Sequence, residues 1–270
     1  SPLQNKMYTD QVGAKYFRAK PIKDVYKEIK YFVDKFNVDY LFFWADNFFI
    51  YPLETMEEFC AMYEEFKLPF YCQSYPTTIN ERKLKLLKKI GLHRIGVGIE
   101  HGNEEFRKKI LDRRWKNKDI LEKLKIPKKY NIQFSVNNIT GFPTETKKLA
   151  FDTIELNRNI TFDTTNAFPY APFHGTHLHK VCLEKGYITN EFNPGSLNVD
   201  IPLDMPQLSR EEIGGLRKTF ALYARMPKKY WPKIKIAEKS DEEGNRVYDE
   251  LKKIYQYEFF GAHKDDDGNE

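Results

Sequence analysis

Acidic and carboxamide side chains stand beside glycines at the ends of several short apolar runs in this chain. Asp46 and Asn47 follow one run, and Glu100 ends another that contains Gly98. Carboxylates and carboxamides accept hydrogen bonds from ammonium and hydroxyl groups, and a glycine on a strand lets a ligand approach the backbone closely. These residues therefore predict a site for a small polar ligand.

The apolar runs alternate with amphipathic segments, which predicts a repeated strand–helix pattern. Because the carboxyl ends of parallel strands meet at one edge of a sheet, the polar residues at these ends can share a single site. The predicted strands are residues 40–44, 70–74, 94–99, 132–139 and 164–169, and the predicted helices are 22–36, 55–66, 80–90, 103–111, 117–126, 147–157, 176–185 and 209–225.

Local signals set the ends of these helices. Thr55-Met56-Glu57-Glu58 and Ser209-Arg210-Glu211-Glu212 match the capping box, and Pro127 is expected to end the helix that begins at Asn117. After Gly186 the pattern fails, and residues 193–208 predict an irregular loop. An extended segment is expected at the amino end, either with a strand hidden in residues 15–18 or with the first strand upstream.

Composition excludes several classes of protein. The chain has 270 residues and is 41% hydrophobic, which is typical of a globular protein, and its longest apolar run, residues 40–44, is too short to cross a membrane. No apolar leader precedes the first helix, so a cytoplasmic location is expected. The net charge is +5, with 44 basic and 39 acidic residues, so the Lys-rich stretches 82–89, 107–118 and 228–235 favour solvated helix surfaces over a nucleic-acid site.

The three cysteines and the histidine-rich segment give little support for a metal site. Cys60, Cys72 and Cys182 are widely spaced and odd in number, which suits a reducing compartment and small core residues. His177 and His179 point apart at a helix start, so together with His174 they do not complete a tetrahedral set. No metal ligand is assigned within the chain. Phe48 and Phe49, beside Asp46, are expected to be exposed aromatic residues near the site.

Five segments in this order and spacing resemble the radical S-adenosylmethionine (radical SAM) superfamily, in the branch with cobalamin-dependent and methylthiotransferase-like members. The similarity covers about residues 16–188. It implies an α/β fold, a parallel partial (β/α) barrel with about five strands and outer helices, plus a helical carboxyl-terminal extension. The segments are 42–48, 72–79, 94–110, 140–146 and 169–186.

The resemblance implies a role for each candidate residue. Asp46 and Asn47 would accept from the ammonium group of S-adenosylmethionine, and Glu100, beside Gly98, would bind the ribose hydroxyls. A helix or turn cap is the alternative role for Asp46 and for Glu100. Ser135 and Asn137, which alternate onto one strand face, would reach the ribose or the substrate, and the loop Gly141-Phe142-Pro143 would bind adenine. Thr144 and His174 depart from the family pattern, and no catalytic residue is assigned.

The resemblance also implies cofactors and partners. The family holds a [4Fe–4S] cluster through three closely spaced cysteines, and this chain contains no such triplet. We therefore expect a core whose first strand and cluster loop lie in a missing amino-terminal segment of the same protein. Further expectations are an unknown substrate, an electron donor such as flavodoxin or ferredoxin, and cobalamin as an additional cofactor.

The expected organisation is a barrel core over residues 1–188, a loop and helical extension over 189–260, and a polar tail over 261–270. The expected activity of the intact protein is reductive cleavage of S-adenosylmethionine to a 5′-deoxyadenosyl radical, with the isolated chain inactive. The alternative function is a non-catalytic barrel module that binds RNA or protein through its Lys-rich helices.

Overall fold

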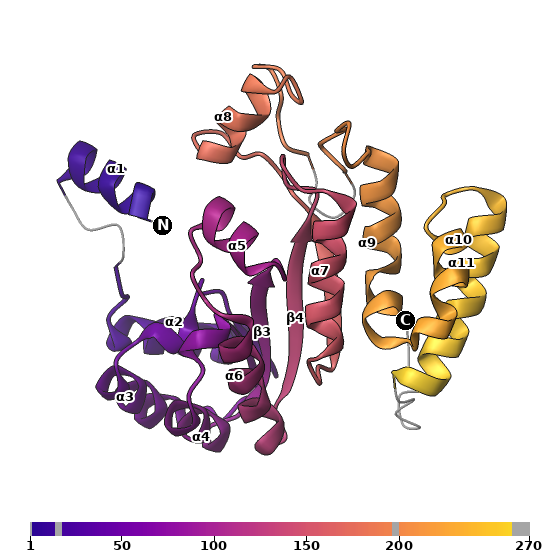
Figure 1. Ribbon diagram of the computed structural model, residues 1–270. Helices are drawn as coiled ribbons and strands as arrows, with labels where there is room; N and C mark the ends of the chain where they lie inside the picture. Colours follow the sequence, from indigo (N-terminus) through magenta and orange to yellow (C-terminus); the bar gives the residue numbers. More distant parts are fainter. Residues whose placement is uncertain (1, 14–17, 196–199, 261–270) are drawn as a thin grey trace.

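A computed structural model of the chain describes residues 2–13, 18–195 and 200–260. Its centre is one five-stranded sheet in which every neighbouring pair is parallel, with the strands in sequence order. A helical connection follows each of the first four strands, so the sheet is built from successive parallel strand–helix–strand units (Figure 1). The strands are β1 (Leu41–Phe43), β2 (Phe70–Ser74), β3 (Leu92–Glu100), β4 (Gln133–Thr140) and β5 (Thr164–Pro169).

Helices accompany the sheet along its whole length (Figure 1). The side chains of Asn80, Asn103 and Thr146 each accept a hydrogen bond from a backbone N–H in the first turn of the helix that follows. The helices are α1 (Pro2–Val12), α2 (Ile22–Phe36), α3 (Leu53–Tyr63), α4 (Glu81–Lys89), α5 (Glu104–Leu111), α6 (Asn117–Lys129), α7 (Lys147–Arg158), α8 (His177–Glu184), α9 (Arg210–Arg225), α10 (Trp231–Ala237) and α11 (Glu242–Ile254).

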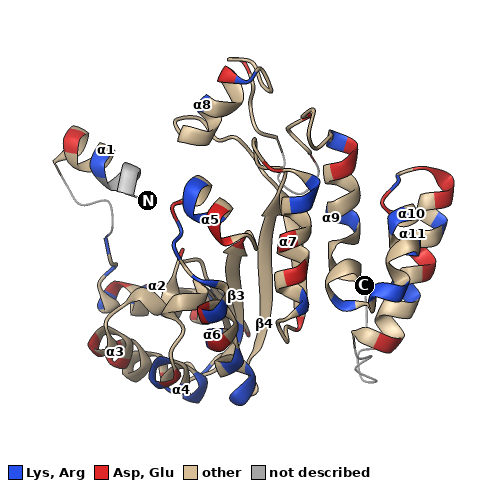
Figure 2. Cartoon of the chain, in the orientation of Figure 1, with Lys and Arg blue, Asp and Glu red and all other residues tan. Residues whose placement is uncertain are grey.

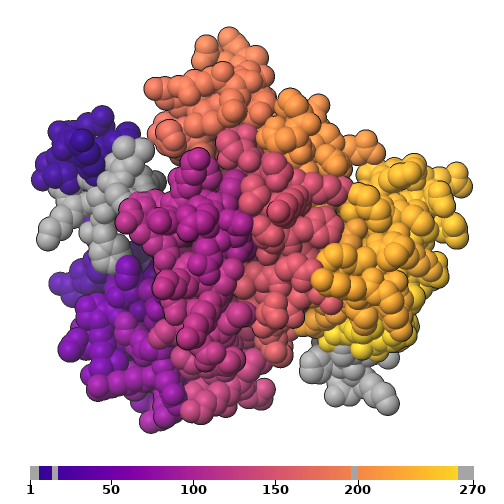
Figure 3. Space-filling view, in the orientation of Figure 1, coloured from indigo at the N-terminus to yellow at the C-terminus, as the bar shows by residue number. Residues whose placement is uncertain are grey.

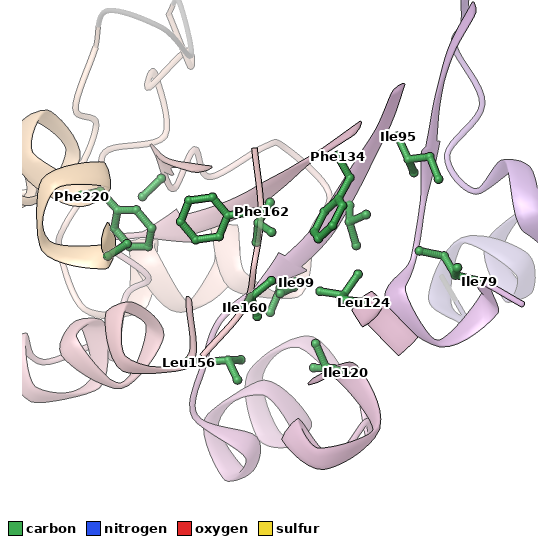
Figure 4. Close-up of a cluster of buried hydrophobic side chains, with 14 of the residues drawn as sticks. Ile79, Ile95, Ile99, Ile120, Leu124, Phe134, Leu156, Ile160, Phe162 and Phe220 are labelled. Atoms are coloured by element: carbon green, nitrogen blue, oxygen red, sulfur yellow. The ribbon is translucent and has the colours of Figure 1, made fainter. Parts of the chain in front are cut away.

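The two faces of the sheet differ in chemistry. In β4, buried Phe134 and Val136 alternate with the partly exposed Ser135 and Asn137. The buried residues pack with Ile95 and with helical side chains in one apolar core, part of which is drawn in Figure 4. The apolar face therefore fixes the register of the strands, and the polar residues are directed to the opposite face.

The chain after α8 adds a helical layer beyond β5. Helix α9 packs on β5, and α10 and α11 form the outermost part of the molecule (Figures 1 and 3). Arg158 of α7 donates to the backbone carbonyls of Tyr223 and Met226, at 2.7 Å each. The predicted capping box of α9 is confirmed, because Ser209 and Glu212 exchange side chain–backbone hydrogen bonds. The predicted helical extension is thus tied to the sheet by packing and by hydrogen bonds.

Three local predictions were wrong. Helix α3 begins at Leu53 after Pro52, so Thr55 does not cap it: the fixed φ of proline already suits the entry to a helix. Helix α6 continues through Pro127 to Lys129, because a proline near the last turn removes only one intrahelical bond. Most of the expected extended amino-terminal segment is helical, in α1.

The aromatic residues expected near the site are also corrected. Phe48 and Phe49 are only 7% and 1% exposed, since a 3-10 turn at Phe48–Ile50 directs them into the core. Nearby aromatic residues that are exposed are instead Phe42 and Trp44, at 66% and 81%. Both belong to β1 or its end, and β1 is an edge of the described sheet, as predicted.

Two predictions fall outside the described residues: the polar tail 261–270 and most of the strand considered at 15–18. The predicted loop at 193–208 lacks helix and strand wherever the structure describes it, apart from an isolated bridge between Met205 and Leu208. Within the described part of the chain, none of the helices has both the length and the apolar character needed to span a bilayer.

Candidate functional site

A cavity of about 450 Å³ opens at the carboxyl ends of the strands. Its lining is polar at the ends of β1, β2 and β3 and apolar toward β5 and α8. Such a mixture suits a ligand with a charged end and an apolar or aromatic end. The lining residues are Asp46, Gln73, Ser74, Tyr75, Gly96, Gly98, Glu100, Leu111, Asn137, Asn138, Ile139, Phe142, Phe168, Pro169, Tyr170, Ala171, Phe173 and Leu178.

Glu100 turns back into this cavity because its backbone is left-handed, with φ of 69°. The pairing of β3 with β4 shifts register between Gly98 and Glu100, so the carboxylate folds over Gly98. A Cβ at Gly98 would lie 2.5 Å from Glu100 Oε1, which means that only glycine leaves room for this arrangement. The glycine-bracketed strand end therefore forms a cradle for a carboxylate.

Arg113 holds the Glu100 carboxylate. Its Nη1 lies 2.9 Å from Glu100 Oε1. Its guanidinium carbon Cζ lies 4.6 Å from the ring centroid of Tyr75 and 5.1 Å from that of Trp115. The Glu100 side chain is only 18% exposed, and this burial raises its pKa, although Arg113 acts in the opposite direction. The site thus contains a shielded acid beside one fixed cation. Glu100 does not cap the next helix, since Asn103 does.

The other predicted acceptors take different positions. Asp46 and Asn137 line the cavity with Glu100. Asn47 lies behind the rim, 6% exposed, where its Oδ1 accepts from Ser74 Oγ at 3.2 Å and Thr78 Oγ1 at 2.9 Å. It therefore joins the ends of β1 and β2.

Ser135 lies two residues before Asn137 on the same strand face. It is absent from the lining of the cavity. Of the polar candidates Asp46, Asn47, Glu100, Ser135 and Asn137, three therefore share the cavity: Asp46, Glu100 and Asn137.

The loop after β4 contributes an aromatic wall. Phe142 lines the cavity, and its ring lies 5.1 Å from that of Tyr170. Gly141, with φ of 84°, makes the turn, and the backbone N–H groups of Gly141 and Phe142 donate to Glu145 Oε2 at 2.5 and 3.1 Å. Gly141 and Pro143 shape this loop without lining the cavity.

Sequence reasoning missed Glu145, His101 and Arg113. Glu145 and His101 are fully buried, and His101 Nε2 lies 3.1 Å from Glu145 Oε1, which joins the loops after β3 and β4. Both residues stand in the strand-end segments, but their pairing spans 44 positions and has no local signal. Arg113 belongs to the Lys-rich stretch interpreted as solvated surface, and only its contact with Glu100 distinguishes it.

The cysteines do not fit an iron–sulfur cluster. All three are buried, in α3, β2 and α8, and burial raises the pKa of Cys60 and of Cys182 to about 11 and that of Cys72 as well. Thiolates are the ligands that clusters require. Across residues 2–13, 18–195 and 200–260, no group of three or more His, Cys, Asp or Glu side chains could hold a metal ion.

Two other surfaces fit a ligand less well. A cavity of about 460 Å³ between α2, β1 and α3 is lined mainly by apolar side chains, including Ile29, Phe32 and Phe42. The exposed helices carry acidic and basic residues together (Figure 2), and Glu81 contacts Lys85 and Lys129. The strand-end cavity is therefore the best candidate site.

Comparisons with known proteins agree with this architecture. The profile of the Radical SAM superfamily matches residues 7–156, more than half of the chain. A tRNA-2-methylthio-N(6)-dimethylallyladenosine synthase of Halalkalibacterium halodurans is 30% identical over 118 residues, which cover 41% of this chain and 21% of that protein. The chain thus spans about a fifth of the length of this relative.

Two solved structures share the fold at low identity. Coproporphyrinogen III oxidase of Escherichia coli, a radical SAM enzyme, has a TM-score of 0.52 at 17% identity, covering 74% of this chain and 45% of that chain. The cobalamin-dependent radical enzyme OxsB, with aqua-cobalamin and S-adenosylmethionine bound, has a TM-score of 0.54 at 10% identity, covering 88% and 42%. Five parallel strands with helices, as in these partial barrels, are the fold predicted for this chain.

Proposed function

This chain belongs to the radical SAM superfamily, and from that premise we propose that its strand-end cavity binds S-adenosylmethionine for reductive cleavage in the intact protein. The observation that carries the proposal is the Glu100 carboxylate, folded over Gly98 into a cavity that Asp46 and Asn137 also line. When bound beside a reduced [4Fe–4S] cluster, the cofactor supplies a 5′-deoxyadenosyl radical, which removes a hydrogen atom from a substrate.

The residues present fit the cofactor in three places. Glu100 accepts the ribose hydroxyls, because an ionised carboxylate can take two hydrogen bonds from neighbouring hydroxyls. Asp46, which is exposed at the cavity, accepts the ammonium group of the methionine end. Asn137, which pairs with Gly98 on the neighbouring strand, supplies a neutral donor and acceptor beside Glu100. These three side chains orient the cofactor by its polar groups.

The apolar part of the cavity suits the adenine. Phe142 and Tyr170 form an aromatic wall, and the backbone of the loop Gly141-Phe142-Pro143 is fixed by Glu145. An aromatic wall excludes water and packs against a flat base. Because the loop beside this wall is already ordered, binding the base costs no further conformational entropy of the loop. In this proposal Gly141 and Pro143 act through the shape of the backbone. Ser135 faces the substrate, and Asn47 holds the ends of β1 and β2 together behind the rim of the cavity.

We propose that the cluster ligands lie outside these 270 residues. The burial of Cys60, Cys72 and Cys182 in three separate elements supports this, as does the open edge of β1, where a further strand can pair. The proposed organisation is a barrel core to residue 188 followed by the extension 189–260. We also propose a cytoplasmic location, and a flavodoxin- or ferredoxin-type electron donor because the cluster needs a reductant. Cobalamin, named for OxsB, is a further proposed cofactor of the intact protein.

The test is anaerobic reconstitution of the full-length gene product with iron and sulfide, followed by reduction and chromatography for 5′-deoxyadenosine. We expect product from the wild type and a loss of about tenfold or more in the Glu100→Gln variant, since charged hydrogen bonds contribute about 1.5–3 kcal/mol. A full-length sequence without three closely spaced cysteines, or a reconstituted protein that forms no product, would contradict the proposal.

The alternative function, a module that binds RNA or protein through Lys-rich helices, has less support. Several cations of the Lys-rich stretches are paired with acidic residues: Arg82 with Glu57, Lys228 with Glu155, and Lys233 with Glu250. Affinity for tRNA that falls steeply with salt and is unchanged by Glu100→Gln would favour this module over the enzyme.

A further inference from the structure

Arg107 of α5 is a buried cation that does not line the cavity. Its side chain is 0% exposed, and its guanidinium donates three hydrogen bonds: Nη1 to the His101 carbonyl at 2.6 Å, and Nη2 to the Trp115 carbonyl at 2.5 Å and to Asn117 Oδ1 at 2.9 Å. Burying a guanidinium is costly unless such partners replace water. The position of these partners indicates what the cation does.

The partners belong to the two segments that carry Glu100 and Arg113. His101 directly follows Glu100 at the end of β3. Trp115 lies in the loop that contains Arg113, and Asn117 directly follows this loop. The backbone N–H of Arg113 also donates to the Arg107 carbonyl, at 3.2 Å. Arg107 thus binds both the segment that follows Glu100 and the segment that contains Arg113.

A second bond closes the same junction. Asn117 Nδ2 donates to the Gly102 carbonyl at 2.8 Å, so the loop 112–116 is fixed to the end of β3 at two points. Asp112 enters this loop in the left-handed conformation, with φ of 50°. Without the guanidinium, the loop would lose its link through Arg107 to the His101 carbonyl and would keep the Asn117–Gly102 bond and the Arg113–Glu100 ion pair.

We propose that Arg107 is a positioning residue of the cofactor site: its guanidinium holds the loop 112–116 so that Arg113 stays against Glu100 and Tyr75, and this placement sets the affinity for S-adenosylmethionine. The inference rests on the proposed function. A planar guanidinium binds two carbonyls and an amide in fixed directions, and an ammonium cannot reproduce this geometry. We therefore expect Arg107→Lys, like Arg107→Gln, to loosen the loop 112–116 and to weaken the binding of S-adenosylmethionine.

Fluorescence of Trp115 reports the loop without any catalytic assay. Its ring lies 5.4 Å from Tyr75 and beneath Arg113. The chain has three tryptophans, so Trp44→Phe and Trp231→Phe leave Trp115 as the single emitter. In this background we expect Arg107→Lys and Arg107→Gln to raise acrylamide quenching of Trp115 at temperatures where circular dichroism shows a folded protein. The matched control is Arg114→Gln in the same loop, because the Arg114 side chain is exposed and pairs with Asp112 at the loop surface.

A double-mutant cycle tests whether Arg107 acts through Arg113. We expect Arg107→Gln and Arg113→Gln each to weaken binding of S-adenosylmethionine by about tenfold, and the double variant to lose no more than the stronger single variant. Additive losses, or unchanged Trp115 quenching in folded Arg107→Lys, would overturn the inference. If the wild type does not bind the cofactor, the proposed function fails, while the quenching experiment still tests the positioning of the loop.

Discussion

At the scale of single residues, the site depends on the Glu100 carboxylate, whose pKa is shifted in opposite directions by burial and by Arg113. Burial of Glu100 raises its pKa, and Arg113 at 2.9 Å lowers it. The ionised form is the one that accepts hydrogen bonds from a ribose, so affinity is present above the pKa of Glu100 and is lost as the pH falls through it.

The variant Arg113→Gln tests this balance. Removing the cation leaves burial unopposed and raises the pKa of Glu100 further, so binding of S-adenosylmethionine should be lost at a higher pH than in the wild type. Dissociation constants measured over a pH series give the two midpoints. Equal midpoints, or a midpoint that moves to lower pH, would show that Arg113 does not control the charge of Glu100. Arg114→Gln serves as the control here too.

At the scale of elements, loops at the strand ends are joined by buried polar contacts. Glu145 accepts from the backbone N–H groups of Gly141 and Phe142 and contacts His101, so it connects the loops after β3 and β4. Asn47 does the same for the ends of β1 and β2. The cavity therefore keeps its shape because each loop is bound to its neighbour.

Replacement of Glu145 should loosen this connection. We expect Glu145→Gln to lower the free energy of unfolding by about 1.5–3 kcal/mol, because charge-assisted hydrogen bonds to two buried N–H groups are weakened. Chemical denaturation measures the change. The control, Glu105→Gln, alters an exposed carboxylate of α5 and should change stability by less than about 0.5 kcal/mol. Equal effects of the two substitutions would refute the role given to Glu145.

Sequence patterns predicted the elements better than the contacts between them. Periodicities and capping boxes depend on neighbours a few positions apart, so all five strands and the capping box of α9 were predicted. The burial of Phe48 and Phe49, the passage of α6 through Pro127 and the role of Asn47 depend on tertiary packing. For the same reason Arg107 and Arg113 stayed hidden among basic residues, although Glu100 was identified from its glycines.

At the scale of the whole molecule, the sheet has two different edges. Helix α9 lies against β5, whereas β1 carries the exposed Phe42 on an edge that is open within the described residues. An open edge with aromatic side chains pairs readily with another chain. We expect the 270-residue chain to associate as its concentration rises.

The variant Phe42→Lys should reduce this association, because a charge on an edge strand opposes pairing. Light scattering after size-exclusion chromatography measures the mass at several concentrations. Tyr257→Lys is the matched control, since Tyr257 is 78% exposed but lies far from the sheet edge. A chain that stays monomeric, or that responds equally to both substitutions, would contradict the prediction.

The separation of the cysteines predicts that this chain alone holds no cluster. After anaerobic incubation with iron and sulfide, we expect substoichiometric iron and no 5′-deoxyadenosine, with the same result for Cys60→Ala and Cys182→Ala. Three buried thiols in α3, β2 and α8 cannot reach one cluster without unfolding. Iron analysis that gives a full cluster per chain would show that the ligands are within these residues.

The central claim is that S-adenosylmethionine binds in the strand-end cavity through Glu100, and equilibrium dialysis of labelled cofactor against the 270-residue chain tests it most directly. We predict saturable binding at one site, displacement by S-adenosylhomocysteine, and a loss of about tenfold or more in Glu100→Gln but not in Glu105→Gln, an exposed glutamate of α5. Absence of saturable binding, or equal binding by the wild type and Glu100→Gln, would contradict the account.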